Sequence, residues 1–302
     1  MSHIPVLIDE VIETTNPKPG EFFIDGTLGS GGHAEEIIKR LTPDGIFLGI
    51  DWDRSSLEEA KIKLGEYGIR KIFLNENYAS LSNILQRYNL PKAEGLLLDL
   101  GFSSMQIEES GKGFSFQKDE PLDMRYNPNE SKETAAEFIN RATQDELARI
   151  LWEYGEERQS RQIAKSIIEE RRKEKILTTK QLVEIIEKTK KRQGKIHPAT
   201  QTFQALRIYI NQELENLQGV LKEIEGIVKE GGRIVVISFH SLEDRTIKQA
   251  FKKLEKEGRG RRINKKVIQP SWEEVQKNPR SRSAKLRALS LLSSPKDEER
   301  SR

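Results

Sequence analysis

The stretch Phe22-Phe-Ile-Asp25-Gly-Thr-Leu-Gly29-Ser-Gly-Gly-His33 decides how the N-terminal part of the chain folds. Its apolar start is typical of a buried strand, and its glycines allow a tight turn with positive φ angles. An amphipathic helix is expected next, because apolar residues recur at helical spacing from 34 to 41. A second apolar run over residues 46–50 ends at Asp51, twenty-two residues after Gly29. The pattern predicts a pocket for a nucleoside cofactor, with Asp51 accepting hydrogen bonds from the ribose hydroxyls.

Two classes of cofactor fit the glycine-rich turn. With Ala34 in third place the turn matches the dinucleotide fingerprint, which is typical of NAD-binding enzymes. Asp25 argues against NAD, because a carboxylate at the end of the first strand repels a doubly anionic pyrophosphate. S-adenosylmethionine has no phosphate and carries a sulfonium and an ammonium group, which the same carboxylate attracts. We therefore expect S-adenosylmethionine as the cofactor, with a plain glycine-rich connector as the structural alternative.

Composition predicts a cytoplasmic protein with a highly charged surface. The chain has 302 residues, enough for one large or two ordinary domains, with 35% hydrophobic and 33% charged residues. No apolar run approaches the roughly 18 residues that span a membrane, and the N-terminus lacks the features of a signal peptide. The absence of cysteine excludes disulfides and thiolate sites. No two of the four histidines have the spacing of metal ligands, so we expect no metal.

A strongly basic segment lies near the C-terminus, although the net charge of the chain is only +3. Residues 256–287 contain eleven Lys or Arg, among them Arg261 and Arg262, and three Glu, a net charge of +8. Such a concentration of basic side chains is typical of proteins that contact the phosphates of nucleic acids. A solvated, partly disordered tail is the alternative interpretation.

Five strand-like runs define the framework of the chain, at residues 22–24, 46–50, 72–74, 95–98 and 233–238. Helical patterns lie between the first four, and this alternation predicts an α/β fold with a parallel, doubly wound sheet. Residues 101–232 separate the last two runs, although a crossover helix with its loops needs only about 30 residues. The surplus predicts an inserted helical subdomain over residues 105–205, between the parts 1–104 and 206–302 of the sheet domain. A long helix from Pro198 is expected to lead back to the sheet and to end at Gly231 and Gly232.

Asp99 follows the fourth apolar run, in Leu96-Leu-Leu-Asp99-Leu-Gly101. It therefore falls on the rim where open α/β sheets bind ligands. The amine of a cytosine or adenine ring is a poor nucleophile, and a carboxylate that accepts its N–H bond localises the lone pair and takes the proton after methyl transfer. Asp99 is thus the first candidate catalytic residue, with a loop or helix cap as the alternative. The Asp-Pro-Pro-Tyr arrangement of many amino methyltransferases is absent, because positions 100 and 101 hold no proline.

A second polar group follows the fifth run, in Ser238-Phe-His240-Ser241-Leu-Glu-Asp244. We expect Ser238, His240 and Ser241 to orient the target base, although residues 241–244 also spell a helix-capping box. His240 falls on the same rim as Asp99, which makes it a second catalytic candidate.

Two further segments permit either a functional or a structural interpretation. His197 follows a basic run and is either a phosphate contact or part of a solvated loop. Phe114 and Phe116 belong to a glycine-hinged loop and either stack a flipped base or fill the core.

Together these segments resemble the bacterial small-subunit (16S) ribosomal RNA (cytosine-N4)-methyltransferase family. The resemblance runs over nearly the whole chain, and several of the matched segments exceed six residues. The segments are His3-Ile-Pro-Val-Leu7, Asp25-Gly-Thr-Leu-Gly-Ser-Gly-Gly-His33, Leu98-Asp-Leu-Gly-Phe-Ser-Ser104, Gly113-Phe-Ser-Phe116, Pro121-Leu-Asp-Met-Arg125, Glu153-Tyr-Gly-Glu156, His197-Pro-Ala-Thr-Gln-Thr-Phe-Gln-Ala-Leu-Arg207, Ser238-Phe-His-Ser-Leu-Glu-Asp-Arg245 and Asn278-Pro-Arg-Ser-Arg-Ser-Ala-Lys-Leu-Arg287.

The resemblance implies a class I (Rossmann-like) S-adenosylmethionine-dependent methyltransferase fold with an inserted helical substrate-recognition domain. It implies methylation of N4 of a cytidine at the decoding centre of 16S ribosomal RNA, within the small ribosomal subunit. By motif position, the residues implied to bind the cofactor are Gly31, Gly32, His33, Asp51, Tyr78, Asp99 and Gln106. The residues expected to bind the RNA are His197, Arg207, Ser238, Ser241, Arg261 and Arg262.

Two other functions compete with this one. A DNA amino methyltransferase is disfavoured by the missing proline pair after Asp99 and by the Leu98-Asp-Leu-Gly101 match. A non-catalytic RNA-binding assembly factor with the same fold is the other competitor, and binding of S-adenosylmethionine separates it from the enzymes.

Overall fold

The computed structural model describes residues 5–101, 111–129, 133–192 and 197–293. The chain divides into two compact units. The first, here called the sheet unit, comprises residues up to 103 and from 214 onward, and the second, the helical unit, comprises residues 104–213. None of the helices in the described ranges is both long enough and apolar enough to cross a membrane.

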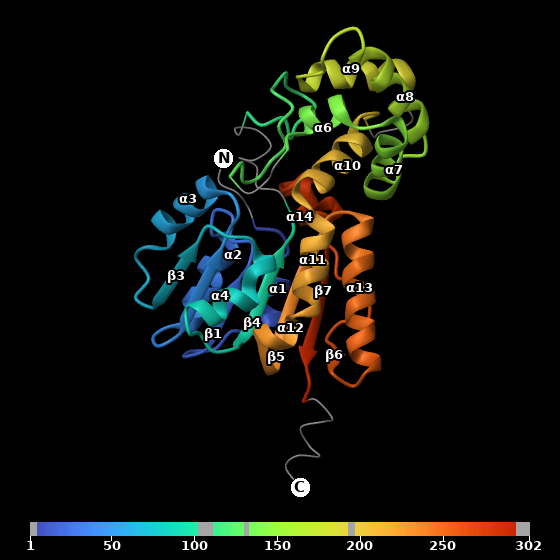
Figure 1. The fold of residues 1–302 in the computed structure, drawn as a ribbon. Helices are drawn as coiled ribbons and strands as arrows, with labels where there is room; N and C mark the ends of the chain where they lie inside the picture. The colour runs from blue at the N-terminus through green and yellow to red at the C-terminus, as the bar shows by residue number, and fades with distance from the viewer. Residues whose placement is uncertain (1–4, 102–110, 130–132, 193–196, 294–302) are drawn as a thin grey trace. The chain divides into compact units, whose positions relative to one another are not determined.

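The sheet unit is built on seven strands within the described residues (Figure 1). They are β1 (Phe22–Asp25), β2 (Ile46–Ile50), β3 (Arg70–Leu74), β4 (Ala93–Asp99), β5 (Val228–Ser238), β6 (Gly260–Arg262) and β7 (Lys285–Leu291). Their order is β3-β2-β1-β4-β5-β7-β6, and only β7 runs antiparallel to its neighbours. The direction of winding reverses between β1 and β4, which is the point where doubly wound sheets bind ligands beyond the carboxyl ends of their strands. The predicted doubly wound α/β fold is confirmed.

Helices cover both faces of this sheet. On one face lie α1 (Ile8–Thr15), α2 (Gly32–Leu41) and α3 (Arg54–Leu64), and on the other lie α4 (Leu81–Arg87), α11 (Glu213–Lys222), α12 (Ile224–Ile227) and α13 (Ser241–Lys256). Alternate strand residues supply the two cores, with Phe22 and Ile24 in one and Phe23 in the other. Burial on both faces explains the apolar runs of β1, β2, β4 and β5 in the sequence. Shorter elements of this unit are η1 (Tyr78–Ser80), α14 (Trp272–Lys277) and η2 (Pro279–Ser283).

Two strands, β6 and β7, begin inside the basic segment 256–287. Arg287 of β7 is buried, and its guanidinium donates to both carboxylate oxygens of Asp244 (2.7 and 3.3 Å). Its neighbours Leu286 and Ala288 belong to the apolar core. The alternative of a solvated tail is therefore wrong for this segment. Basic and apolar residues alternate at residues 285–288 because β7 is an antiparallel strand whose basic side chains pair with an acidic residue.

The helical unit contains α6 (Ala135–Arg141), α7 (Gln144–Gly155), α8 (Ser160–Arg171), α9 (Thr179–Thr189) and α10 (Thr200–Asn211). They enclose an apolar core of their own, in which Phe138 and Ile150 are fully buried. Leu122 and Met124, from the segment before α6, complete this core.

The predicted long helix from Pro198 to Gly231 and Gly232 is wrong. Its place is taken by α10, α11 and α12, and residues 228–232 already belong to β5. The first break is at Gln212, which is left-handed (φ 51°) and whose N–H donates to the carbonyls of Ile208 and Tyr209. A C-cap of this kind usually carries glycine, so the sequence gives no signal for it.

The two units divide after residues 103 and 213, whereas the sequence places the divisions after 104 and 205. The second difference follows from α10, which packs in the helical core through Phe203, Leu206 and Ile210.

Candidate active site

Three carboxyl groups converge at the edge of the sheet where β1, β2 and β4 end. Asp25 is the last residue of β1 and Asp99 the last of β4, and Asp51 directly follows β2. The three strands are parallel and adjacent, so their carboxyl ends lie side by side. The charges of Asp99 and Asp51 both act on Asp25. The structure thus brings Asp51 and Asp99 to one rim, as the strand pattern predicts.

Backbone hydrogen bonds hold the glycine-rich turn against this rim. Leu28 N–H donates to the carbonyl of Ile50 (2.9 Å), and Gly29 N–H donates to Oδ2 of Asp51 (2.7 Å). Gly31 is the N-cap of α2 with φ 78°, and a Cβ at this position would lie 3.1 Å from the side chain of Leu64. Both the positive φ and the close approach require glycine. The turn therefore fixes the start of α2, where His33 lies, relative to the carboxylates.

Asp51 organises the loop that follows β2. Its Oδ1 accepts the N–H of Asp53 (2.8 Å), and its Oδ2 accepts that of Gly29. Burial raises the pKa of Asp51 to about 6, and the two N–H groups oppose this increase. Each carboxylate oxygen has a second lone pair, so both keep capacity to accept hydrogen bonds from a ligand. This geometry suits the predicted contact with two ribose hydroxyls.

His33 is a buried imidazole whose ring nitrogens have no hydrogen-bond partner among the described residues. The residue is 6% exposed, and its Nε2 lies 3.5 Å from Oδ2 of Asp99. Buried polar atoms without partners destabilise a fold, by about 1–3 kcal/mol each. The arrangement indicates a site where a ligand completes the contacts or where a proton moves between His33 and Asp99.

The environment of Asp25 favours a positively charged ligand. Burial raises the pKa of Asp25 to about 7, whereas the charge of His33 and the N–H of Thr27 lower it. The nearby Asp99 and Asp51 add to the increase. A cation in this position stabilises the ionised carboxylates, and the pyrophosphate of a dinucleotide has the opposite effect. The residues present therefore fit S-adenosylmethionine better than NAD.

One carboxylate oxygen of Asp99 accepts a local hydrogen bond, whereas the other faces His33. The backbone N–H of Asp99 donates to Oγ1 of Thr27 (2.6 Å), and its Oδ1 accepts the N–H of Gly101 (3.3 Å). Asp99 therefore stabilises the turn after β4, which was the structural alternative, while Oδ2 is directed toward His33.

The remaining two cofactor residues implied by the resemblance are Tyr78 and Gln106. Tyr78 begins η1 and lies against Gly26, where a Cβ would come within 3.2 Å of the Tyr78 Cβ. Gln106 lies outside the described residues, and its role stays a prediction.

His240 is the N-cap of α13. Its Nδ1 accepts the N–H of Glu243 (3.4 Å), and its Nε2 lies 3.1 Å from Oε1 of that buried glutamate. The capping box is thus formed by His240 and Glu243, and the predicted box over residues 241–244 is shifted by one residue. Because Nδ1 faces the backbone, only Nε2 is left for proton transfer, and the catalytic role of His240 stays a prediction.

The two serines near the end of β5 have different settings. Ser238 is fully buried, and its hydroxyl donates to the carbonyl of Lys285 (3.4 Å). Ser241 is exposed in the first turn of α13. Contacts of either serine with a target base stay predictions.

In the helical unit, His197 and Arg207 are both held by glutamates. The His197 ring stacks on Phe116 (centroids 4.7 Å apart), and its Nε2 lies 3.2 Å from Oε1 of Glu187. Arg207 makes a bidentate pair with Glu213 (2.7 and 2.8 Å). Phe116 also packs on the helical core, which supports the core-filling interpretation. Their proposed contacts with RNA stay predictions, and in this structure their contacts stabilise the unit.

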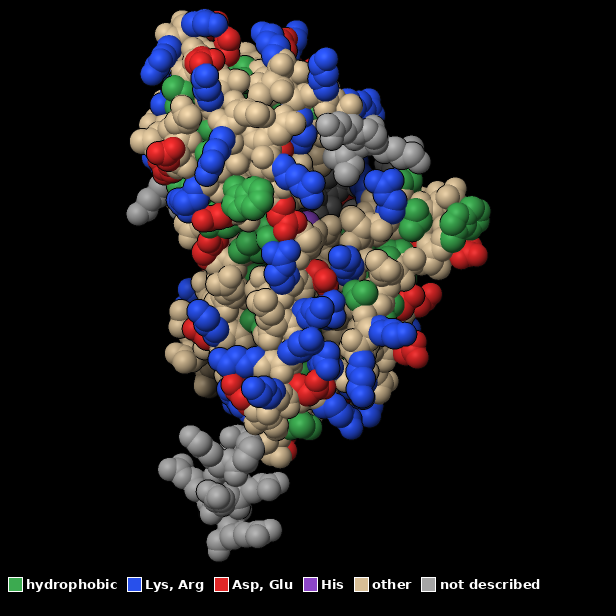
Figure 2. All heavy atoms as spheres, turned by 90° about the vertical axis from the view of Figure 1, so that its right-hand side faces the viewer, with side chains coloured by type: hydrophobic (Ala, Val, Ile, Leu, Met, Phe, Trp, Pro, Cys, Tyr) green, Lys and Arg blue, Asp and Glu red, His purple; other side chains and the backbone are tan. Residues whose placement is uncertain are grey.

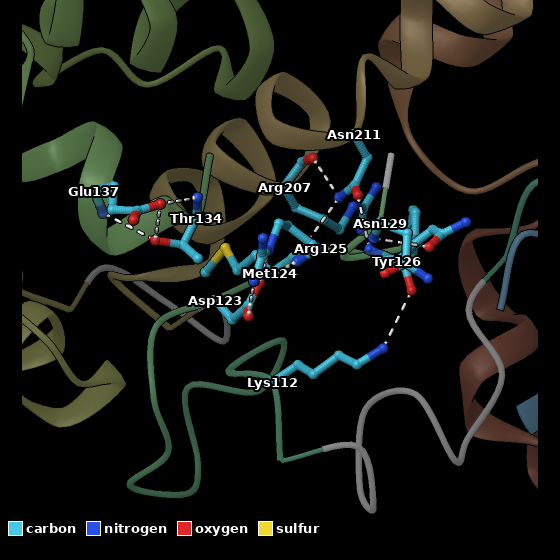
Figure 3. A network of polar contacts seen from close by, with 11 residues as sticks. Lys112, Asp123, Met124, Arg125, Tyr126, Asn129, Thr134, Glu137, Arg207 and Asn211 are labelled. Atoms are coloured by element: carbon cyan, nitrogen blue, oxygen red, sulfur yellow. Dashed lines mark hydrogen bonds and ion pairs between the residues drawn. The ribbon is translucent and has the colours of Figure 1, made fainter. Parts of the chain in front are cut away.

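Asn211 is a residue of the helical unit that the sequence did not indicate. Its fully buried side chain joins the end of α10 to the segment before α6 (Figure 3). Oδ1 accepts the N–H of Tyr126 (2.9 Å), and Nδ2 donates to the carbonyls of Met124 (2.8 Å) and Arg207 (2.9 Å). An asparagine at the end of a helix is a weak signal in a sequence, because its partners are 85 and 87 residues away.

We expect Asn211→Ala to lower the free energy of unfolding by at least about 2 kcal/mol. The substitution leaves the partly buried N–H of Tyr126 and the buried carbonyl of Met124 without partners, and such groups cost about 1–3 kcal/mol each. Urea denaturation followed by circular dichroism measures the change. The matched control is Asn129→Ala, because Asn129 is exposed and, among the described residues, its side chain makes no hydrogen bond. Equal stability of the two variants would contradict the assigned role.

The basic surface of the sheet unit lies over α13 and the strands beyond it. Lys and Arg side chains cover much of the face that carries α13 (Figure 2). Arg261 is exposed, whereas the guanidinium of Arg262 donates to Oε2 of Glu255 (2.7 Å). The two arginines, which the sequence treats alike, thus differ in their freedom to contact a phosphate.

Comparison with known proteins identifies the family. The model of the MraW methylase family matches residues 1–292. The chain belongs to the MraW methylase family. A relative from Dehalococcoides mccartyi, named ribosomal RNA small subunit methyltransferase H, is 44% identical over 97% of this chain and 87% of its own length. A relative of the same name from Clostridioides difficile is 42% identical over 96% of this chain and 99% of its own.

Membership of the MraW methylase family confirms three expectations. The chain is a methyltransferase, its cofactor is S-adenosylmethionine, and its sheet has the class I methyltransferase architecture. The competing expectation of an NAD enzyme is wrong. The roles of Asp51 toward the ribose and of Asp99 toward the methionine part of the cofactor stay predictions.

Proposed function

We propose that this methyltransferase acts in the cytoplasm on small-subunit (16S) ribosomal RNA, where it methylates N4 of a cytidine at the decoding centre. The RNA class is supported by relatives named ribosomal RNA small subunit methyltransferase H. The chemistry is supported by one observation above all, the carboxylate of Asp99 on the ligand-binding rim with Oδ2 3.5 Å from the buried His33. An aromatic amine needs a group that accepts its N–H bond and later its proton, and Asp99 is of the right kind.

Asp99 and His33 on the rim have different roles in the proposed reaction. When bound, S-adenosylmethionine would supply an electrophilic methyl group, with its sulfur as the leaving group. Asp99 accepts an N–H of the cytosine amine, which directs the nitrogen lone pair out of the ring. After transfer N4 carries a positive charge, and Asp99 takes its proton. His33 Nε2, 3.5 Å from Oδ2, is the next group able to receive that proton.

Mass analysis of ribosomal RNA nucleosides tests the proposal. Purified enzyme with isotope-labelled S-adenosylmethionine is given either naked 16S RNA or assembled small subunits. We expect label in N4-methylcytidine at one position, with one of the two substrates preferred. Label only in another nucleoside of the RNA would overturn the proposed substrate.

A further prediction concerns the basic surface. Arg261 pairs in register with Ser290, which pairs with Arg233, so Arg261 lies five residues along β5 from Ser238. This is roughly 17 Å at about 3.3 Å per residue. RNA contacts at Arg261 therefore involve a segment distant from the target base.

We expect Arg261→Glu to weaken RNA binding and to lower the log–log salt slope by about 0.7–0.9, the share of one phosphate contact. The transfer rate at saturating RNA should stay unchanged. Filter binding over a range of salt concentrations measures the slope. Lys92→Glu, an exposed charge reversal outside the basic segment, is the control. If both variants give the same slope as the wild type, Arg261 does not contact RNA.

A further inference from the structure

The helical unit contains a hollow of about 650 Å³ between α7 and the start of α8. Its lining includes Trp152 and three arginines, Arg149, Arg158 and Arg161. Asp145, Arg149 and Trp152 are spaced to share one face of α7. Trp152 is 58% exposed, although tryptophan is a residue that folding usually buries.

The hollow carries positive charge that the protein does not neutralise. Arg149 is paired with Glu153 at 2.8 Å. Arg158 and Arg161 are exposed and form no ion pair within the described residues. Asp145 is the one carboxylate in the lining, against three guanidinium groups.

A polar atom in the lining also lacks a partner. The side-chain oxygen of Gln159 is buried and accepts no hydrogen bond from the described residues. Such an atom destabilises the fold unless a ligand or water supplies a donor. Amine groups of bases and the 2′-hydroxyl of ribose are donors of this kind.

We propose that this hollow binds a single-stranded segment of the RNA substrate, with Trp152 stacking on one base and Arg158 and Arg161 contacting the adjoining phosphates. Exposed aromatic rings beside unpaired cations are the arrangement by which proteins hold single-stranded nucleic acids without reading their sequence. Guanidinium groups also suit the geometry of phosphates. The proposal rests on RNA being the substrate, and it adds an anchoring site in the helical unit. The base that we place in this hollow is not the cytidine that is methylated.

An acidic protein segment is the competing occupant. Such a segment would pair with the arginines, but it would not account for the flat, exposed ring of Trp152. The chemistry of the lining thus favours RNA, and the test below separates the two.

Binding to an oligouridylate of about ten nucleotides, measured by fluorescence anisotropy on the full-length enzyme, tests the site. We expect Trp152→Ala to weaken binding about fivefold or more, because base stacking on an aromatic ring contributes about that factor or more. Trp152→Phe should restore a large part of the affinity, since it keeps a flat ring. Arg158→Glu with Arg161→Glu should lower the salt slope by about 1.4, at about 0.7 for each single-strand phosphate contact.

The matched control is Arg172→Glu with Lys175→Glu. Both side chains are exposed, make no ion pair in the described part of the chain and follow α8 at its other end. This end is roughly 15 Å from the hollow at 1.5 Å per residue. The double control variant should bind as the wild type does, and S-adenosylmethionine affinity should be equal in all variants.

Three outcomes would overturn the inference. They are wild-type affinity in the Trp152→Ala and double arginine variants, an equal loss in the control variant, and tight binding of polyglutamate that depends on Trp152. Failure of the proposed function would give a different result. The wild-type enzyme would then still bind oligouridylate through this hollow, but it would form no N4-methylcytidine in ribosomal RNA.

Discussion

Replacement of Asp99 by Asn is expected to slow single-turnover methyl transfer by about 10²–10⁴, the usual contribution of a general base. Asparagine keeps the shape and one acceptor oxygen but has no charge and does not take up the amine proton. The bond from Gly101 N–H and the backbone bond to Thr27 survive the change, so the turn after β4 is preserved. Loss of rate is then attributable to the chemistry of Oδ2. Rapid quench with both substrates saturating is the measurement, because it separates transfer from binding.

His33→Gln is the informative companion of this variant. If His33 receives the proton from Asp99, the substitution changes the pH dependence of the transfer rate. If His33 only fills space beside the cofactor, it changes affinity and leaves the pH profile as it was. Near wild-type transfer in Asp99→Asn would mean that Asp99 is a cofactor ligand only and that the proton leaves to water or to His240.

The sequence predicts the first five strands because each contains an apolar run, which is buried in β1, β2, β4 and β5 and only partly buried in the edge strand β3. It does not predict β6 and β7, whose basic side chains Arg262 and Arg287 interrupt the apolar pattern and pair with acids of α13. Arg287 is the clearest case, since its burial depends on Asp244, 43 residues earlier. The break after α10 is hidden for a related reason. Gln212 takes a conformation usual for glycine, and the long-range bonds of Asn211 hold the end of that helix.

The candidate site was predictable where spacing along the chain determines position. Asp51 and Asp99 are ends of parallel strands, and parallel strands place their ends on one edge. The environment of these residues was not predictable, because burial and pairing are properties of the folded state. The raised pKa of Asp25, the unpaired nitrogens of His33 and the use of His240 as a helix cap all belong to this class.

The second large effect is expected for the cofactor. Asp51→Ala should weaken S-adenosylmethionine binding roughly ten- to over a hundredfold, because hydrogen bonds to a charged acceptor contribute about 1.5–3 kcal/mol. The substitution also removes the acceptor of Gly29 N–H and so loosens the turn. Asp51→Asn keeps one acceptor oxygen and should lie between the alanine variant and the wild type. Isothermal titration calorimetry with the purified enzyme measures all three affinities.

The pH dependence of the same calorimetric titration shows whether the loss of affinity is due to the Asp51 carboxylate. The pKa of Asp51 is about 6 in the free protein, and ribose hydroxyls donate to the ionised carboxylate, so a proton competes with the cofactor. Affinity should therefore be full above pH 6 and fall as the pH drops below it, approaching tenfold per unit for one proton. Asp25 also titrates, at about pH 7 in the wild type, and Asp51→Asn lowers its pKa by removing a neighbouring negative charge. The decisive quantity is therefore the difference between wild type and Asp51→Asn around pH 6 and below. If the two curves run parallel through pH 6, the ribose does not bind to the Asp51 carboxylate, and the turn at Gly29 is the main function of this residue.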